Sequence, residues 1–178
     1  MTRMPQNFAD VARATFPDQE NPVTSPNRLA WPGLLLAVTL LDQASKHWVL
    51  GWANPDAPYR VTRWFNVVLA HNQGAAFSFL ANGGSSSRIL FSLVALAALL
   101  FMGRLMWQHG DKALFCSGLA LIMGGALGNL VDRLRLGTVT DFIQWHVGEH
   151  YWPAFNVADS AITAGVVILL LDQIRKPS

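Results

Sequence analysis

The residues of this chain best suited to chemistry are acidic side chains set in apolar segments. Asp42 lies in one such segment with Lys46 four residues later, Asp132 ends another, and Asp159 lies inside a third. An acid four residues before a lysine is the favourable order for an ion pair along a helix. Ionisable groups cost roughly 2.5 kcal/mol or more at the centre of a membrane helix, so they persist where they face a partner or a water-filled cavity. These positions are therefore candidate functional residues.

Two asparagines accompany these acids. Asn129 precedes Asp132 by three residues, and Asn156 precedes Asp159 by three, so each amide shares a helical face with a carboxylate. Two carboxylates held close together share one proton, because like charges raise one pKa, and such a pair can activate water for peptide hydrolysis. A further acid, Asp141, follows in a loop and would by itself be interpreted as a solvated charge. The residues alone do not decide whether Asp132 or Asp141 belongs to a pair.

The composition is that of a membrane protein. Charged residues make up 13% of the 178 residues and apolar types 52%, whereas soluble domains carry roughly 25% charged residues. A net charge of +2 gives no indication of a nucleic-acid partner. The single cysteine, Cys116, cannot form an internal disulfide, and no His-Glu-x-x-His or zinc-type spacing is present. We expect no metal and no cofactor.

The hydropathy pattern predicts an all-α integral membrane protein with four transmembrane helices, each near the ~20 residues needed to cross a bilayer. A polar, proline-containing tail over 1–27 is expected to be flexible and cytoplasmic, followed by a membrane domain over 28–176. A cleaved signal peptide is the weaker interpretation of the first apolar segment, since no small-x-small site follows promptly. Short strand-like stretches over 59–69 and 138–142 predict a small extracytoplasmic β element and loop resting on the membrane surface. The helices are expected at about 29–52, 88–107, 113–132 and 155–174.

Four antiparallel spans would bring all the polar groups to one membrane face. The end of the first helix, the end of the third and the start of the fourth lie on the same side in such a bundle. Seven Lys and Arg residues on the opposite side against five on this one favour cytoplasmic termini and a site at the outer face. All seven tryptophans fall near a predicted membrane end or in a loop beside one, and the indole ring is favoured at the membrane interface.

Two other classes of protein also carry acids in membrane helices. A small proton-coupled transporter should show acids at several depths or broken helices rather than one cluster at one face. A non-enzymatic assembly factor would tolerate replacement of its acids by asparagine. The sequence contains neither the Gly-x-Ser-x-Gly nor the Gly-x-Gly-Asp motif of other intramembrane proteases.

Five short motifs, in order along residues 42 to 159, resemble those of the bacterial lipoprotein signal peptidases, also called signal peptidase II. One such motif would be weak support, whereas five in sequence on the expected elements are specific. The long N-terminal tail departs from the compact family pattern but contains none of the motifs. The motifs are Asp42–Lys46 (DQASK), Asn72–Phe77 (NQGAAF), Gly125–Arg133 (GALGNLVDR), Val139–Phe142 (VTDF) and Phe155–Asp159 (FNVAD).

This resemblance implies an aspartyl peptidase in the bacterial inner membrane, with both termini in the cytoplasm and its site at the periplasmic face. Its expected partners are the lipid bilayer and diacylglyceryl-modified prolipoproteins, cleaved before the lipidated cysteine, and we expect a monomer. The resemblance places the catalytic pair on Asp141 and Asp159. The residues expected to bind substrate or support the site are Asn72, Asn129 and Asn156, which would orient the aspartates or hold the substrate backbone, Asp132 with Arg133 as an ion pair or substrate contact, and Asp42 with Lys46 as a brace.

Overall fold

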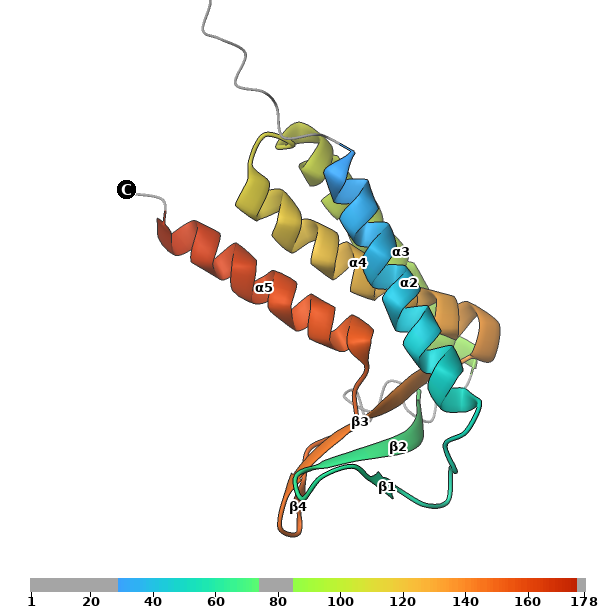
Figure 1. Cartoon of the computed structure of the whole chain (residues 1–178). Helices are drawn as coiled ribbons and strands as arrows, with labels where there is room; N and C mark the ends of the chain where they lie inside the picture. The colour runs from blue at the N-terminus through green and yellow to red at the C-terminus, as the bar shows by residue number, and fades with distance from the viewer. Residues whose placement is uncertain (1–28, 74–84, 176–178) are drawn as a thin grey trace, which may run out of the picture.

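The computed structural model describes residues 29–73 and 85–175. The predicted architecture, mostly helical with a small antiparallel sheet, is confirmed (Figure 1). The expectation for the 1–27 tail lies outside these residues, as does the 74–77 part of the NQGAAF motif. The helices are α2 (Ala30–Leu50), α3 (Ser85–Gln108), α4 (Ala113–Leu136) and α5 (Val157–Arg175), and the strands are β1 (Tyr59–Arg60), β2 (Phe65–Asn72), β3 (Val139–Val147) and β4 (His150–Tyr151).

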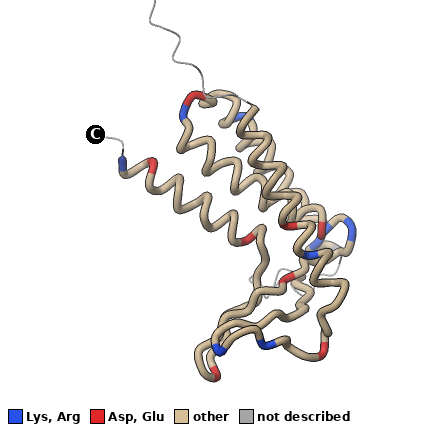
Figure 2. Tube along the Cα trace, in the orientation of Figure 1, with Lys and Arg blue, Asp and Glu red and all other residues tan. Residues whose placement is uncertain are grey.

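Three of the described helices, α3, α4 and α5, are long and apolar enough to cross a membrane. The first helix, α2, has 21 residues and carries Asp42 and Lys46 in its second half. The expectation of four spans therefore stays a prediction for α2. Charged residues gather toward the two ends of the helices, and α3, α4 and α5 carry none in their middle portions (Figure 2).

Helix α4 is the centre of the bundle, because it packs against each of α2, α3 and α5. Small residues on α4, among them Ala120, Gly124 and Gly128, permit this close approach, as is usual for helix packing in membranes. A Cβ on Gly124 would lie 2.7 Å from Cβ of Val38 in α2. On the other side of α4, a Cβ on Gly125 would collide with the backbone carbonyl of Ala158 in α5.

Replacing Gly165 of α5 by valine is expected to destabilise the bundle. A Cβ there would lie 2.6 Å from the carbonyl oxygen of Gly118 in α4, so the two helices would have to separate. Overpacking of this kind costs about 1–3 kcal/mol. The matched control is Gly33→Ala in α2, where a Cβ meets nothing within 4 Å and helix propensity favours alanine. Thermal unfolding in detergent should show a lower midpoint for Gly165→Val only, and equal midpoints for the two variants would contradict this packing.

The sheet lies at one end of the helices, while the start of α2 and the end of α5 lie at the other (Figure 1). Its four strands are antiparallel in the order β1-β2-β3-β4. Val49 at the end of α2 packs with Val67 and Phe142 in a buried apolar cluster that fastens the sheet to the bundle. Asp141 of β3 lies opposite Ala70 of β2, next to the helix ends.

The chain turns sharply between α4 and β3. Gly137 adopts a left-handed conformation, with φ of 80°, and its N–H donates to the carbonyl of Arg133. Glycine is favoured at such a helix C-terminus because it has no Cβ to clash. The turn brings Thr140 back beside the last turns of α4, where its N–H donates to Oδ2 of Asp132 at 3.0 Å.

Candidate active site

Asp141 is held at the start of β3 by two asparagine amides. Nδ2 of Asn156 donates to Oδ1 of Asp141 at 2.7 Å, and Nδ2 of Asn72 donates to its Oδ2 at 3.0 Å. The carboxyl is only 2% exposed. Burial, followed by the charge of nearby Asp159, raises the pKa of Asp141 to about 6, although the two amide bonds act in the opposite direction. A carboxyl with this pKa can hold a proton at mildly acidic pH.

Asp159 lies in the first turn of α5 and forms a reciprocal cap with Asn156. The N–H of Asp159 donates to Oδ1 of Asn156 at 2.9 Å, and the N–H of Asn156 donates to Oδ2 of Asp159 at 3.2 Å. This capping-box arrangement satisfies two helix N–H groups and places the carboxylate at the positive end of the helix dipole. The same asparagine thus contacts both Asp141 and Asp159.

A second asparagine connects this pair with the polar residues of α2. Asn129 of α4 donates from Nδ2 to Oδ1 of Asp159 at 2.9 Å, and its Oδ1 accepts from Lys46 Nζ at 2.9 Å and from Asn156 at 3.2 Å. These partners fix which way the Asn129 amide points. The lysine therefore orients an amide donor toward Asp159.

Lys46 is buried in a three-way ion pair. Its Nζ lies 2.8 Å from Asp42 and 3.0 Å from Asp132, and Lys46 and Asp42 are 2% and 0% exposed. With the bond to Asn129, all three ammonium hydrogens have acceptors. Asp42 also accepts from the N–H of Ala158 at 2.9 Å, which joins α2 to the start of α5. These contacts join α2 to α4 and α5, while the role of Asp42 and Lys46 as a brace stays a prediction.

Arg133 does not form the expected ion pair with Asp132. That carboxylate is occupied by Lys46, by the N–H of Thr140 and by Gln43, while Arg133 donates to the carbonyl of Asn129 at 3.4 Å. The Arg133 guanidinium lies 5.6 Å from the ring centre of Phe91 in α3.

Sequence reasoning missed Gln43. Its Nε2 donates to Oδ1 of Asp132 at 2.9 Å and to the carbonyl of Gly128 at 3.1 Å, so it holds α2 against α4. A polar residue directly after Asp42 in an apolar helix was the available signal. Gly128 is also part of this contact, because a Cβ there would collide with the Asp42 carboxylate.

A cavity of about 360 Å³ opens beside Asp141. Asn72 lines it with Asp141, and His71 and Pro153 form other parts of its wall. This volume lies within the range of ligand pockets, about 300–1,000 Å³. Within residues 29–73 and 85–175 no three His, Cys, Asp or Glu side chains converge as a metal-ligand set. The arrangement offers two neighbouring carboxyl groups oriented by amides, and one of them, Asp141, lines the cavity.

Solved structures share this fold. The chain superposes on a bacterial membrane enzyme determined by the in meso method at 1.9 Å resolution with a TM-score of 0.74, covering 83% of this chain and 94% of that one. A second structure of a bacterial membrane enzyme, at 2.3 Å, gives 0.72 over 84% and 93% of the two chains. Both are 24% identical in sequence, so they support the fold alone.

Sequence comparison is more specific. A lipoprotein signal peptidase of Paraburkholderia phytofirmans is 47% identical over 146 residues, which cover 82% of this chain and 85% of the relative. One from Burkholderia thailandensis is also 47% identical, over 82% and 88% of the two chains. The profile of the family described as Signal peptidase (SPase) II, Peptidase_A8, matches residues 34–175. With this match over most of its length, the chain belongs to the signal peptidase II family of peptidases.

Proposed function

We propose that this protein is an intramembrane aspartyl endopeptidase that removes the signal peptide from diacylglyceryl-modified prolipoproteins, cleaving before the lipidated cysteine. The observation that carries the proposal is the sharing of Asn156 by Asp141 and Asp159 beside a cavity. The relatives named lipoprotein signal peptidase support the substrate class. We further propose that α2 spans the membrane with the other helices, that the termini are cytoplasmic and that the site faces the periplasm.

The two carboxyls can divide the acid and base roles. Asp159 is favoured as the ionised partner, since it caps α5 and accepts the Asn129 amide that Lys46 orients. Asp141 is favoured as the protonated partner, because its burial raises its pKa to about 6.

Hydrolysis then follows with no covalent intermediate. Asp159 takes a proton from water as the water oxygen attacks the scissile carbonyl carbon, and Asp141 gives its proton to the carbonyl oxygen. In the resulting gem-diol, Asp159 returns a proton to the amide nitrogen and the carbon–nitrogen bond breaks. A diol hydroxyl gives its proton to Asp141, which restores the original pair. Hydrogen bonds from Asn156 and Asn129 keep the two carboxyl groups in position through both steps.

The substrate class is tested by reconstituting the full chain in liposomes with two forms of one precursor. One form carries diacylglyceryl on the cysteine, and the other is the same polypeptide without lipid. We expect cleavage of the lipidated form with the modified cysteine as the new N-terminus, which mass spectrometry identifies. Equal cleavage of both forms, or cleavage at another bond, would refute the proposed specificity.

The Asn72→Ala variant is expected to move the upper limb of the pH profile of kcat/KM to higher pH. Activity requires a proton on the pair, so it falls as the pH rises through the raised pKa of Asp141. The Asn72 hydrogen bond lowers this pKa, and its removal therefore raises it. Asn54→Ala, which removes an exposed loop amide, is the matched control. A limb that stays in place, or moves to lower pH, would contradict the contact between Asn72 and Asp141.

A further inference from the structure

A second pocket, of about 610 Å³, lies on the sheet away from the candidate active site. Asn66 of β2 and Gln144 of β3 are cross-strand partners within its lining, so they mark one face of the sheet. Asp141 lies three residues before Gln144 on the same strand and therefore points to the opposite face. The pocket is thus separate from the cavity beside Asp141.

Two arginines make this pocket basic. Arg60 and Arg63 both line it and are both exposed, against a single acid, Glu149. The guanidinium of Arg63 stacks 3.9 Å above the ring centre of Trp64, and Nε of Arg60 donates weakly to the carbonyl of Thr62 at 3.4 Å. Neither arginine forms an ion pair with a carboxylate in the described part of the chain. Their remaining N–H donors suit the oxygens of a phosphate.

The pocket wall also contains an unsatisfied polar atom. Nε2 of His146 is buried and has no hydrogen-bond partner among the described residues, while its Nδ1 lies 3.3 Å from the carbonyl of Gly148. The imidazole is fixed by stacking on Tyr151, with ring centres 5.1 Å apart. A buried polar atom without a partner is energetically costly.

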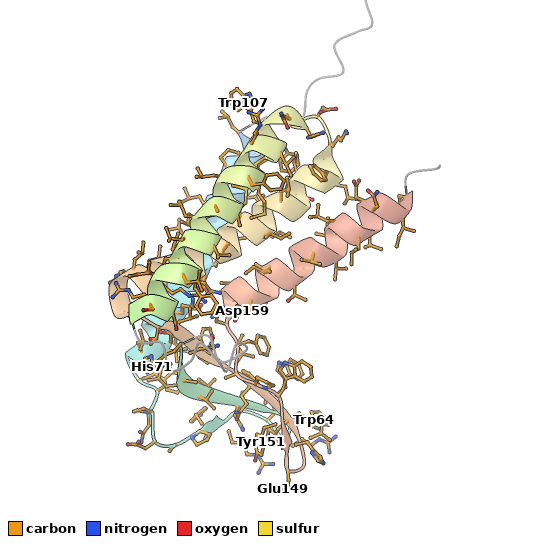
Figure 3. The ribbon with its side chains drawn as sticks, turned by 180° about the vertical axis from the view of Figure 1, so that it is seen from behind. Trp64, His71, Trp107, Glu149, Tyr151 and Asp159 are labelled. Atoms are coloured by element: carbon orange, nitrogen blue, oxygen red, sulfur yellow. The ribbon has the colours of Figure 1, made fainter. Side chains whose placement is uncertain are left out.

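Exposed aromatic side chains link this pocket to the membrane end of α2. Trp48 contacts Trp52, which in turn contacts Tyr59 next to Arg60, with ring centres 5.3 and 5.5 Å apart. Trp64 lies beside Tyr151 and Glu149 at the end of the sheet farther from the helices (Figure 3). Tryptophan and tyrosine are enriched at the headgroup level of a bilayer. An arginine pair bordered by such rings is better suited to binding a lipid headgroup than to binding a solute that is free in water.

We propose that Arg60 and Arg63 bind the phosphate of a membrane phospholipid and so attach the sheet to the headgroup layer. The phosphate accepts hydrogen bonds from the two guanidinium groups, and the neighbouring aromatic rings contact the glycerol and upper acyl region. This site requires only that the helices lie in a membrane, and it is independent of the proposed proteolytic function.

The test is calorimetric titration of the full chain, in neutral detergent at low ionic strength, with dihexanoyl phosphatidylglycerol. Dihexanoylglycerol, which lacks the phosphate, and inorganic phosphate are the comparison ligands. We expect the phospholipid to bind more tightly than either, and Arg60→Gln with Arg63→Gln to weaken it about 25-fold, roughly fivefold for each arginine. Glu149→Gln should strengthen binding, because it removes the acid from the pocket.

Arg104→Gln is the matched control, since it removes an exposed arginine from α3 near the opposite end of the bundle. It should leave phospholipid binding unchanged. Unchanged binding in the double arginine variant would overturn the proposal. Inorganic phosphate binding as tightly as the phospholipid would also overturn it, by showing a site for the free anion. Because both replaced arginines are exposed, the thermal unfolding midpoint should remain that of the parent protein.

Discussion

Replacing either Asp141 or Asp159 by asparagine is expected to reduce cleavage of a lipidated precursor by roughly ten-thousandfold or more. Asparagine keeps the size of the side chain but cannot exchange a proton, so the pair loses either its base or its acid. Because both residues serve one proton cycle, the double variant should be hardly worse than either single variant. Single-turnover cleavage in liposomes measures all three rates.

The control for this prediction is Asp56→Asn, the same chemical change in an exposed loop that precedes the sheet. This variant should cleave the lipidated precursor at the same rate as the parent protein. All variants should retain the parent unfolding midpoint within a few degrees, which separates loss of chemistry from loss of structure. Normal processing by either the Asp141 or the Asp159 variant would refute an aspartyl mechanism for this site.

The Lys46→Met variant is expected to lose about 3–5 kcal/mol of stability, the cost typical of breaking a buried ion pair. Methionine is similar in length, but it leaves Asp42 and Asp132 buried without their counter-charge. Asn129 also loses the ammonium that orients it, so residual folded protein should cleave slowly. Thermal unfolding in detergent measures the loss of stability.

Two further variants check that charge causes this effect. Lys112→Met changes an exposed lysine before α4 and should leave the unfolding midpoint unchanged. Adding Asp132→Asn to Lys46→Met removes one of the two uncompensated charges, so part of the stability should return. A double variant less stable than Lys46→Met alone would show that packing, rather than charge balance, dominates at Lys46.

Much of this arrangement follows from local sequence patterns. Helical spacing predicted the Asp42–Lys46 ion pair, which the structure contains. The expected antiparallel bundle placed this pair at the same level as Asn129 and Asp159, and in the structure Lys46 contacts Asn129, which contacts Asp159. The strand-like stretch around Asp141 was also predicted and forms β3. Periodicity and the cost of burying charge are sufficient for these features, because each depends on residues a few positions apart.

Other features depend on contacts between distant segments. Sequence patterns alone do not distinguish the roles of Asp132 and Asp141. The turn at Gly137 separates them, so that Asp132 contacts Lys46 and Asp141 contacts Asn156. Asn156 was expected on a helical face with Asp159, whereas it precedes α5 and caps it. Spacing alone cannot determine which of several partners a polar side chain selects.

The most direct measurement is an experimental structure of the full chain with a non-cleavable precursor peptide. In this ligand a hydroxyethylene group replaces the scissile amide, so its hydroxyl stands for the attacking water or diol oxygen. The proposed mechanism predicts that this hydroxyl lies within hydrogen-bond distance of both Asp141 and Asp159. A hydroxyl bound away from the two carboxyls, or carboxyls turned apart around the ligand, would contradict it.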